Sequence, residues 1–125
     1  MVGRGKKILL VEDEAIIAMD ISVRLRRLGY LVPAHASTAQ EAVDLDRAEN
    51  PDFILMDIRL AGELDGIDAA RHILARRKVP IAFMTGYTNE ETLLRCSALT
   101  PIACLPKPVN MGQVQGAIEL ALERL

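Results

Sequence analysis

The hydrophobic positions of this chain fall into short apolar runs that alternate with longer segments of helical period. The short runs are apolar throughout rather than alternating with polar residues, which is typical of strands buried on both faces of a parallel sheet. The predicted strands are residues 6–11, 30–34, 52–57, 80–85 and 101–105. Five such strands, separated by five helical segments and short loops, indicate an α/β fold with helices on both faces of the sheet.

Apolar stripes and capping residues delimit the five helices. The first is predicted from about Glu14 to Leu28, with Gly29 as its C-terminal stop. The second and fourth each begin at a threonine followed three residues later by a glutamate, the pattern of a capping box. The predicted N-caps of the second to fifth helices are Thr38, Asp65, Thr88 and Asn110. These helices are expected to end near residues 49, 77, 99 and 125.

Right-handed crossover connections leave few topologies for such a chain. We expect a flavodoxin-like (βα)5 fold, a doubly wound parallel sheet with strand order 2-1-3-4-5. Pro33 agrees with this order, because the second strand then lies at a sheet edge, where a missing backbone N–H is tolerated. Folds of this type bind ligands outside the C-terminal ends of the strands, at the switch point between strands 1 and 3. Candidate chemistry is therefore sought at those ends.

Polar side chains gather at the predicted strand ends. Glu12 and Asp13 follow the first strand, and Asp57 and Thr85 end the third and fourth, while Lys107 follows the fifth. Clustered carboxylates need a compensating cation, and hard oxygen ligands suit Mg²⁺. An aspartate can accept a phosphoryl group as an acyl phosphate, and a lysine and a threonine can contact phosphate oxygens. The pattern predicts that Asp57 is phosphorylated beside a magnesium site.

Taken singly, each of these residues also has an ordinary structural explanation. Acidic residues at 12–14 suit the positive N-terminal end of a helix dipole, and Asp57 suits a turn after a strand. Lys107 could be a solvated loop lysine and Thr85 a β-branched strand residue. The functional interpretation rests on the whole set, in the right order on successive strands.

Composition narrows the class of protein. The 125 residues suit one domain, residues 1–125, and half of them are hydrophobic. A net charge of −2 argues against nucleic-acid binding through a basic field. Cys96 and Cys104 lack zinc spacing, and we expect reduced, buried thiols. The apolar run near the N-terminus is too short for a signal peptide or membrane span, so we expect a cytoplasmic protein that does not bind membranes.

The segments ILLVEDE, ILMDIRL, FMTGY and LPKP together make the chain resemble the receiver domain of two-component response regulators over essentially its whole length. The resemblance implies that Asp13 and Asp57 bind Mg²⁺ directly and that Glu12 acts through water. It also implies a further ligand, the backbone carbonyl of Arg59. Asp57 would take its phosphoryl group from a phosphohistidine on a sensor histidine kinase or phosphotransfer protein. A receiver of this kind reacts on itself and is not a conventional enzyme.

The sequence departs from the usual receiver at the switch. Most receivers have Tyr or Phe three residues before the lysine, where this chain has Cys104. The segment 83–87, FMTGY, instead resembles a subgroup known for a Phe-Ala-Thr-Gly-Tyr motif. In that interpretation Thr85 and Tyr87 form the switch. The alternative is that Tyr87 is an ordinary surface loop residue.

The segment that follows Asp57 departs as well. IRLAGELDG is one residue longer before its Asp-Gly than the common pattern, so its contacts cannot be carried over. Arg59 places a long cation beside the site, where it could pair with Glu12 or Glu63, shield an acyl phosphate from water or point into solvent. We hypothesise that Arg59 influences the lifetime of the phosphate.

Two surfaces are candidates for partners. Ala15, Ile16 and Met19 lie partly off the core stripe of the first helix, and by resemblance kinases and phosphotransfer proteins dock there. We expect a single receiver domain without an effector domain, and the sequence does not name the downstream protein. Apolar residues beyond the main stripe of the last helix indicate a homodimer or partner face formed by helix 4, strand 5 and helix 5, or else a wide core stripe.

Two other classes of protein are alternatives to a receiver. A phosphatase of the haloacid-dehalogenase type also forms an aspartyl phosphate, but it would need Asp-x-Asp at the end of the first strand, where this chain has Glu-Asp-Glu. A pseudo-receiver, a binding module with the same fold, would normally lack Asp57, the acidic pair or Lys107. All of these residues are present.

Overall fold

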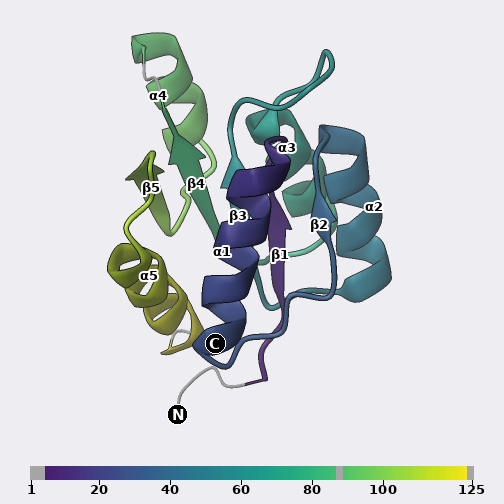
Figure 1. Cartoon of the computed structure of the whole chain (residues 1–125). Coiled ribbons are helices and arrows are strands. Elements are labelled where there is room, and N and C mark those ends of the chain that lie inside the picture. Colours follow the sequence, from purple (N-terminus) through teal and green to yellow (C-terminus); the bar gives the residue numbers. More distant parts are fainter. Residues whose placement is uncertain (1–4, 87–88, 124–125) are drawn as a thin grey trace.

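One parallel sheet of five strands organises the molecule, and the computed structural model describes residues 5–86 and 89–123 (Figure 1). The strands are β1 (Ile8–Val11), β2 (His35–Ala36), β3 (Phe53–Asp57), β4 (Ile81–Thr85) and β5 (Ala103–Pro106). The helices are α1 (Ala15–Arg27), α2 (Ala39–Glu49), α3 (Gly66–Arg76), α4 (Glu90–Ser97) and α5 (Met111–Glu123). The strand order is β2-β1-β3-β4-β5, which confirms the predicted flavodoxin-like topology.

The central strands divide their side chains between two hydrophobic clusters. Successive residues of a strand point to opposite faces of the sheet. Leu10 and Leu55 therefore pack on one face, with residues of α1 and α5, while Leu9 and Ile54 pack on the other, with residues of α2, α3 and α4. β1 and β3 are buried along their whole length, so the continuous apolar runs of the sequence match strands covered on both faces.

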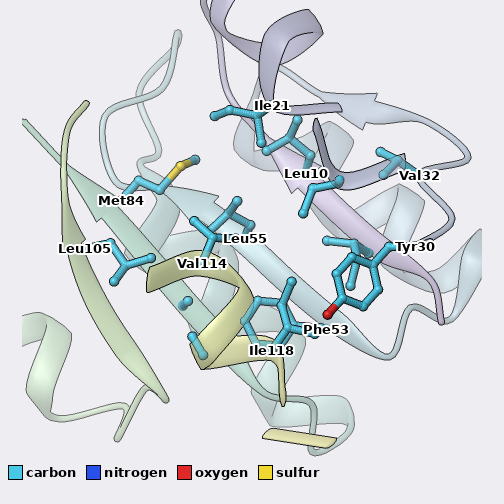
Figure 2. Packing of buried hydrophobic residues seen from close by; sticks show 14 of the residues in the cluster. Leu10, Ile21, Tyr30, Val32, Phe53, Leu55, Met84, Leu105, Val114 and Ile118 are labelled. Atoms are coloured by element: carbon cyan, nitrogen blue, oxygen red, sulfur yellow. The ribbon is translucent and has the colours of Figure 1, made fainter. Parts of the chain in front are cut away.

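The last helix packs against the middle of the sheet. Figure 2 shows Val114 and Ile118 of α5 facing Leu55 and Phe53 of β3. Met111 and Leu122 are partly buried against the same cluster, whereas Leu120 is exposed. The apolar residues beyond the main stripe therefore largely widen the core stripe, and the residues at 124–125 lie outside the described part of the chain.

The second strand lies later in the chain than predicted. It comprises His35–Ala36, and only an isolated bridge between Lys7 and Leu31 marks the expected segment 30–34. Pro33 falls between these two pairings and has no N–H to donate, which accounts for the interruption of the ladder. Its place at the sheet edge is as predicted.

The helix caps agree with the sequence except at α4. The side chains of Thr38, Asp65 and Asn110 accept backbone N–H groups three residues later. The predicted cap at Thr88 is wrong: the N-cap is Asn89, whose Oδ1 accepts the N–H of Thr92 at 2.7 Å. Asparagine is among the best N-caps, and it competes with threonine one residue away.

The chain shows no helix, among those described, that is both long enough and apolar enough to cross a membrane.

Candidate functional site

The strand ends bring the predicted acidic residues together. β1 and β3 pair with Val11 opposite Met56, so the residues that follow, Glu12 and Asp57, lie side by side at the ends of these strands. The backbone N–H of Glu12 donates to Ala36 O at 2.9 Å and so fixes the start of the turn. Both carboxylates lie at the switch point of the sheet, where an α/β fold of this topology places its ligand.

Lys107 joins the two carboxylates. Its Nζ donates to Glu12 Oε1 at 2.9 Å and to Asp57 Oδ2 at 3.1 Å. The backbone N–H of Lys107 donates to Thr85 O at 2.9 Å, which places β5 and its lysine beside the end of β4. The peptide bond between Lys107 and Pro108 is cis. Lys107 is therefore a partly buried cation within the acidic cluster and not a solvated loop lysine.

Backbone groups hold the other carboxylate oxygens. Glu12 Oε2 accepts the N–H of Glu14 at 3.0 Å, and Asp57 Oδ1 accepts the N–H of Arg59 at 3.2 Å. Glu12 is 0% exposed and Asp57 is 3% exposed. Two buried carboxylates are costly to hold unless they are paired and hydrogen-bonded, and here both conditions are met.

The donor set fits a hard divalent cation. One carboxylate oxygen from each of Glu12, Asp13 and Asp57 lies within 4.8 Å of the other two. Asp13 is exposed at the mouth of the site, while the other two carboxylates lie beneath it. Oxygen ligands of this kind, open to solvent on one side, suit Mg²⁺, which keeps several waters.

The pKa values of the two buried acids are shifted in opposite directions. Burial, together with the neighbouring Glu12 carboxylate, raises the pKa of Asp57 to about 6, although Lys107 opposes the shift. Burial would also raise the pKa of Glu12, but hydrogen bonds from Lys107 and the Glu14 N–H outweigh it and lower that pKa. Burial and the Glu12 carboxylate raise the pKa of Asp13. A second cation would therefore be stabilised here.

A cleft of about 950 Å³ opens over the cluster. Asp13, Asp57 and Lys107 line it, and so does Ile16 from the first turns of α1. Ile16 is 85% exposed and Met19 is 68% exposed, and Ala15 is exposed beside them. Of the predicted docking residues, Ile16 lines the cleft, while Ala15 and Met19 are exposed on the same helix.

The remaining sequence predictions have different outcomes. Arg59 lines the cleft, but within the described ranges its guanidinium pairs with neither Glu12 nor Glu63, and Glu12 pairs with Lys107 instead. Thr85 ends β4 as predicted. Tyr87 lies outside the described residues, so its proposed part in the switch stays a prediction.

Two residues near the site were not anticipated. Gly66, the first residue of α3, donates its N–H to Ile58 O at 2.7 Å, and a Cβ on it would lie 2.0 Å from the Asp57 carbonyl oxygen. Arg95 of α4 binds both carboxylate oxygens of Asp65, at 2.8 and 3.1 Å. The sequence Asp65-Gly66 could have indicated that the backbone approaches another segment closely at Gly66. No local pattern, in contrast, indicates the contact between Arg95 and Asp65, which are 30 positions apart.

Comparison with known proteins decides the family. The family model described as the response regulator receiver domain matches residues 8–119. This chain belongs to the response regulator receiver family. It is 37% identical over 119 residues to the transcriptional regulatory protein PdtaR of Mycobacterium tuberculosis, covering 95% of this chain and 58% of that protein. It is 36% identical to the phyllosphere-induced regulator PhyR of Methylorubrum extorquens, covering 93% of this chain and 43% of that one.

Solved structures agree. The receiver domain of a modulated diguanylate cyclase from Desulfovibrio desulfuricans superposes with a TM-score of 0.90 at 33% identity, covering 96% of this chain and 95% of that one. The anti-anti-sigma factor PhyR of Bartonella quintana gives a TM-score of 0.78 at 34% identity, covering 95% and 49%. The receiver thus spans about half the length of the curated relatives named above.

Proposed function

We propose that this receiver accepts a phosphoryl group on Asp57 in a Mg²⁺-dependent reaction and so switches partner binding in two-component signal transduction. The observation that supports this most strongly is the bridge that Lys107 makes between Glu12 and Asp57, with Asp13 at the mouth of the same site. Lys107 neutralises part of the negative charge of the cluster, and the remaining carboxylate oxygens are available to bind a second cation.

Asp57 acts as the nucleophile. One of its carboxylate oxygens attacks the phosphorus in line, and the bond from phosphorus to the leaving group breaks. With a phosphohistidine donor the leaving group is the imidazole of a sensor histidine kinase or phosphotransfer protein. The N–H of Arg59 and the ammonium of Lys107 hold the Asp57 carboxylate in a fixed orientation before attack.

Glu12, Asp13 and Asp57, with the backbone carbonyl of Arg59, would hold Mg²⁺. The ion would supply charge neutralisation for the transferring group and for the carboxylates. Asp13, which is exposed, would contact it from the solvent side, and Glu12 would act through water. Lys107 remains close enough to Asp57 to neutralise a phosphoryl oxygen there.

The output follows from the added charge. A phosphoryl group brings close to two negative charges to the end of β3. Thr85, at the end of β4 next to Lys107, would donate to a phosphoryl oxygen and bias the segment containing Tyr87. A few kcal/mol of differential stabilisation is enough to shift such a two-state element. The readers of that shift would be an unknown downstream protein or a second copy bound through the face of α4, β5 and α5.

The donor docks on α1 in this proposal. Ile16 presents an apolar side chain at the cleft that holds the reacting carboxylate, and Met19 is exposed on the same helix. A kinase or phosphotransfer protein that covers them would bring its phosphohistidine to the mouth of the site. Exposed apolar groups beside a reactive centre favour a protein partner over a small substrate.

A phosphorylation assay tests the proposal. The protein is incubated with phosphoramidate and Mg²⁺, and intact mass reports the gain of one hydroxylamine-sensitive phosphoryl group. We expect no gain in Asp57→Asn or with EDTA, and a much slower gain in Asp13→Asn. Asp44→Asn, an exposed carboxylate on α2, is the matched control and should react like wild type. Failure of wild type to react, with small donors and with phosphorylated kinases, would favour a pure binding module.

A further inference from the structure

The two cysteines lie against each other between α4 and β5. Cys96 Sγ of α4 and Cys104 Sγ of β5 are 2.8 Å apart, closer than ordinary contact between sulfur atoms. Cys96 is 2% exposed, whereas Cys104 is exposed to solvent, so the expectation that both thiols are buried is wrong for Cys104. Its strand lies at the edge of the sheet, which leaves outward positions uncovered.

We propose that Cys96 and Cys104 form a reversible intramolecular disulfide when the protein meets a hydroperoxide, and that this bond ties α4 to β5. Both thiols are free in this structure, so the pair is a dithiol poised for oxidation. A disulfide S–S bond of about 2.05 Å requires the sulfur atoms to approach by less than an ångström from their present separation.

The two thiols have different parts in the reaction. The Cys104 thiolate attacks one peroxide oxygen, the O–O bond breaks, and the departing oxygen leaves as water or alcohol after taking a proton. This gives a sulfenic acid on Cys104. The Cys96 sulfur then attacks the Cys104 sulfur, and the hydroxyl group leaves as water with the Cys96 proton. Overall the dithiol loses two electrons and two protons, and the peroxide is reduced.

Accessibility and acidity support this order. Cys104 is the thiol that solvent reaches. Burial and the neighbouring sulfur raise the pKa of the Cys96 thiol to about 12, which makes it a poor first nucleophile. Once Cys104 is oxidised, the contact at 2.8 Å compensates for the low acidity of Cys96, because the second step needs no diffusion.

The position of the pair gives the bond a consequence for signalling. Cys104 pairs with Phe83 across β4 and β5, two residues before the pairing of Thr85 with Pro106. α4 begins shortly after β4 ends, and Cys96 is in its last turn. A bond between the two cysteines would therefore restrict the movement of α4 relative to the strand that leads into Lys107.

Free-thiol counting and peptide mass test the bond directly. The protein is treated with a small molar excess of hydrogen peroxide, with no phosphodonor, so the result does not depend on phosphorylation of Asp57. Trypsin cuts after Arg95 and leaves both cysteines in one peptide. We expect both thiols to disappear, that peptide to lose the mass of two hydrogen atoms, and dithiothreitol to reverse both changes in a protein that stays monomeric.

Single variants define the roles of the thiols. Cys96→Ser should accumulate a sulfenic acid that dimedone traps at Cys104, or a disulfide-linked dimer, whereas Cys104→Ser should react far more slowly. Circular dichroism confirms that each variant is folded. The proposal is overturned if wild type remains reduced under these conditions, or if it yields the same dimedone adduct or dimer as Cys96→Ser.

Amide hydrogen exchange tests the consequence. Oxidation should slow exchange in residues 90–97 of α4 and leave α2 unchanged, because α2 packs on β1 and β2, at the other end of the sheet from β5. Equal exchange of α4 in the oxidised and reduced forms would show that the bond does not tie α4 to β5.

Discussion

Substitution of Gly66 by alanine should disturb the backbone on which Asp57 sits. Gly66 is the buried first residue of α3, and its N–H binds Ile58 O at 2.7 Å. An added Cβ would lie 2.0 Å from the carbonyl oxygen of Asp57 and 2.9 Å from Met56 Cγ. The nearest obstacle is backbone of a central strand and not the end of a flexible side chain, so it cannot move aside cheaply.

The size of the effect follows from this contact. Overpacking a well-packed core typically costs about 1–3 kcal/mol, and we expect the upper end or beyond, about 3 kcal/mol, because β3 or α3 must shift. For a domain of this length, 1 kcal/mol corresponds to roughly 3–5 °C in Tm, so Gly66→Ala should melt about 10–15 °C below wild type.

A second glycine provides a matched control. Gly116 is exposed in the middle of α5, and a Cβ there would meet no heavy atom within 4 Å. Gly116→Ala should therefore stabilise the protein by about 0.5–1 kcal/mol, because alanine is the better helix former. Urea unfolding followed by circular dichroism measures both variants. Ordinary surface substitutions change the free energy of unfolding by up to about 0.5 kcal/mol. If the free energy of unfolding of Gly66→Ala lay within that margin of the wild-type value, the reasoning would be refuted.

Two further predictions concern α4. Arg95→Ala should destabilise the protein by about 1 kcal/mol at neutral pH. Arg71→Ala should have little effect, because the exposed Arg71 makes only a looser contact with Asp68, at 3.8 Å. Burial acts to raise the pKa of Asp65, but Arg95 outweighs it and lowers that pKa below 3.8. The stability that Arg95 contributes should therefore be lost as the pH falls through the folded-state pKa of Asp65. If wild type remained more stable than Arg95→Ala in acid, this reasoning would be contradicted. Asn89→Ala should cost about 1 kcal/mol in urea unfolding and Asn89→Asp almost nothing; equal losses would contradict the cap.

The sequence was most informative where one residue's environment depends on its neighbours in the chain. The continuous apolar runs predicted the buried central strands because β1 and β3 are covered on both faces. The order of Asp57 and Lys107 along the chain, combined with a parallel topology, was enough to place both at one edge of the sheet.

Local pattern was less informative where tertiary contacts decide. The apolar segment 30–34 lies beside β1 but pairs only at Leu31, because Pro33 interrupts the ladder. The Arg95–Asp65 pair and the pairing of buried Asp46 with Arg76 and Arg77 join residues about 30 positions apart, which no capping or periodicity rule anticipates. Cys104 was expected to be buried because cysteine usually is, but an edge strand exposes part of its surface.

The most direct test of the central claim is to locate the phosphoryl group by chemical reduction. The protein is phosphorylated with a small phosphodonor and Mg²⁺, then treated with sodium borohydride, which reduces an aspartyl phosphate to homoserine. Peptide mass spectrometry should find the conversion at position 57 and at no other carboxylate, including Asp13 in the same cluster. Conversion at Asp13 or another residue, or phosphorylation without any reducible acyl phosphate, would contradict the assignment of Asp57 as the acceptor.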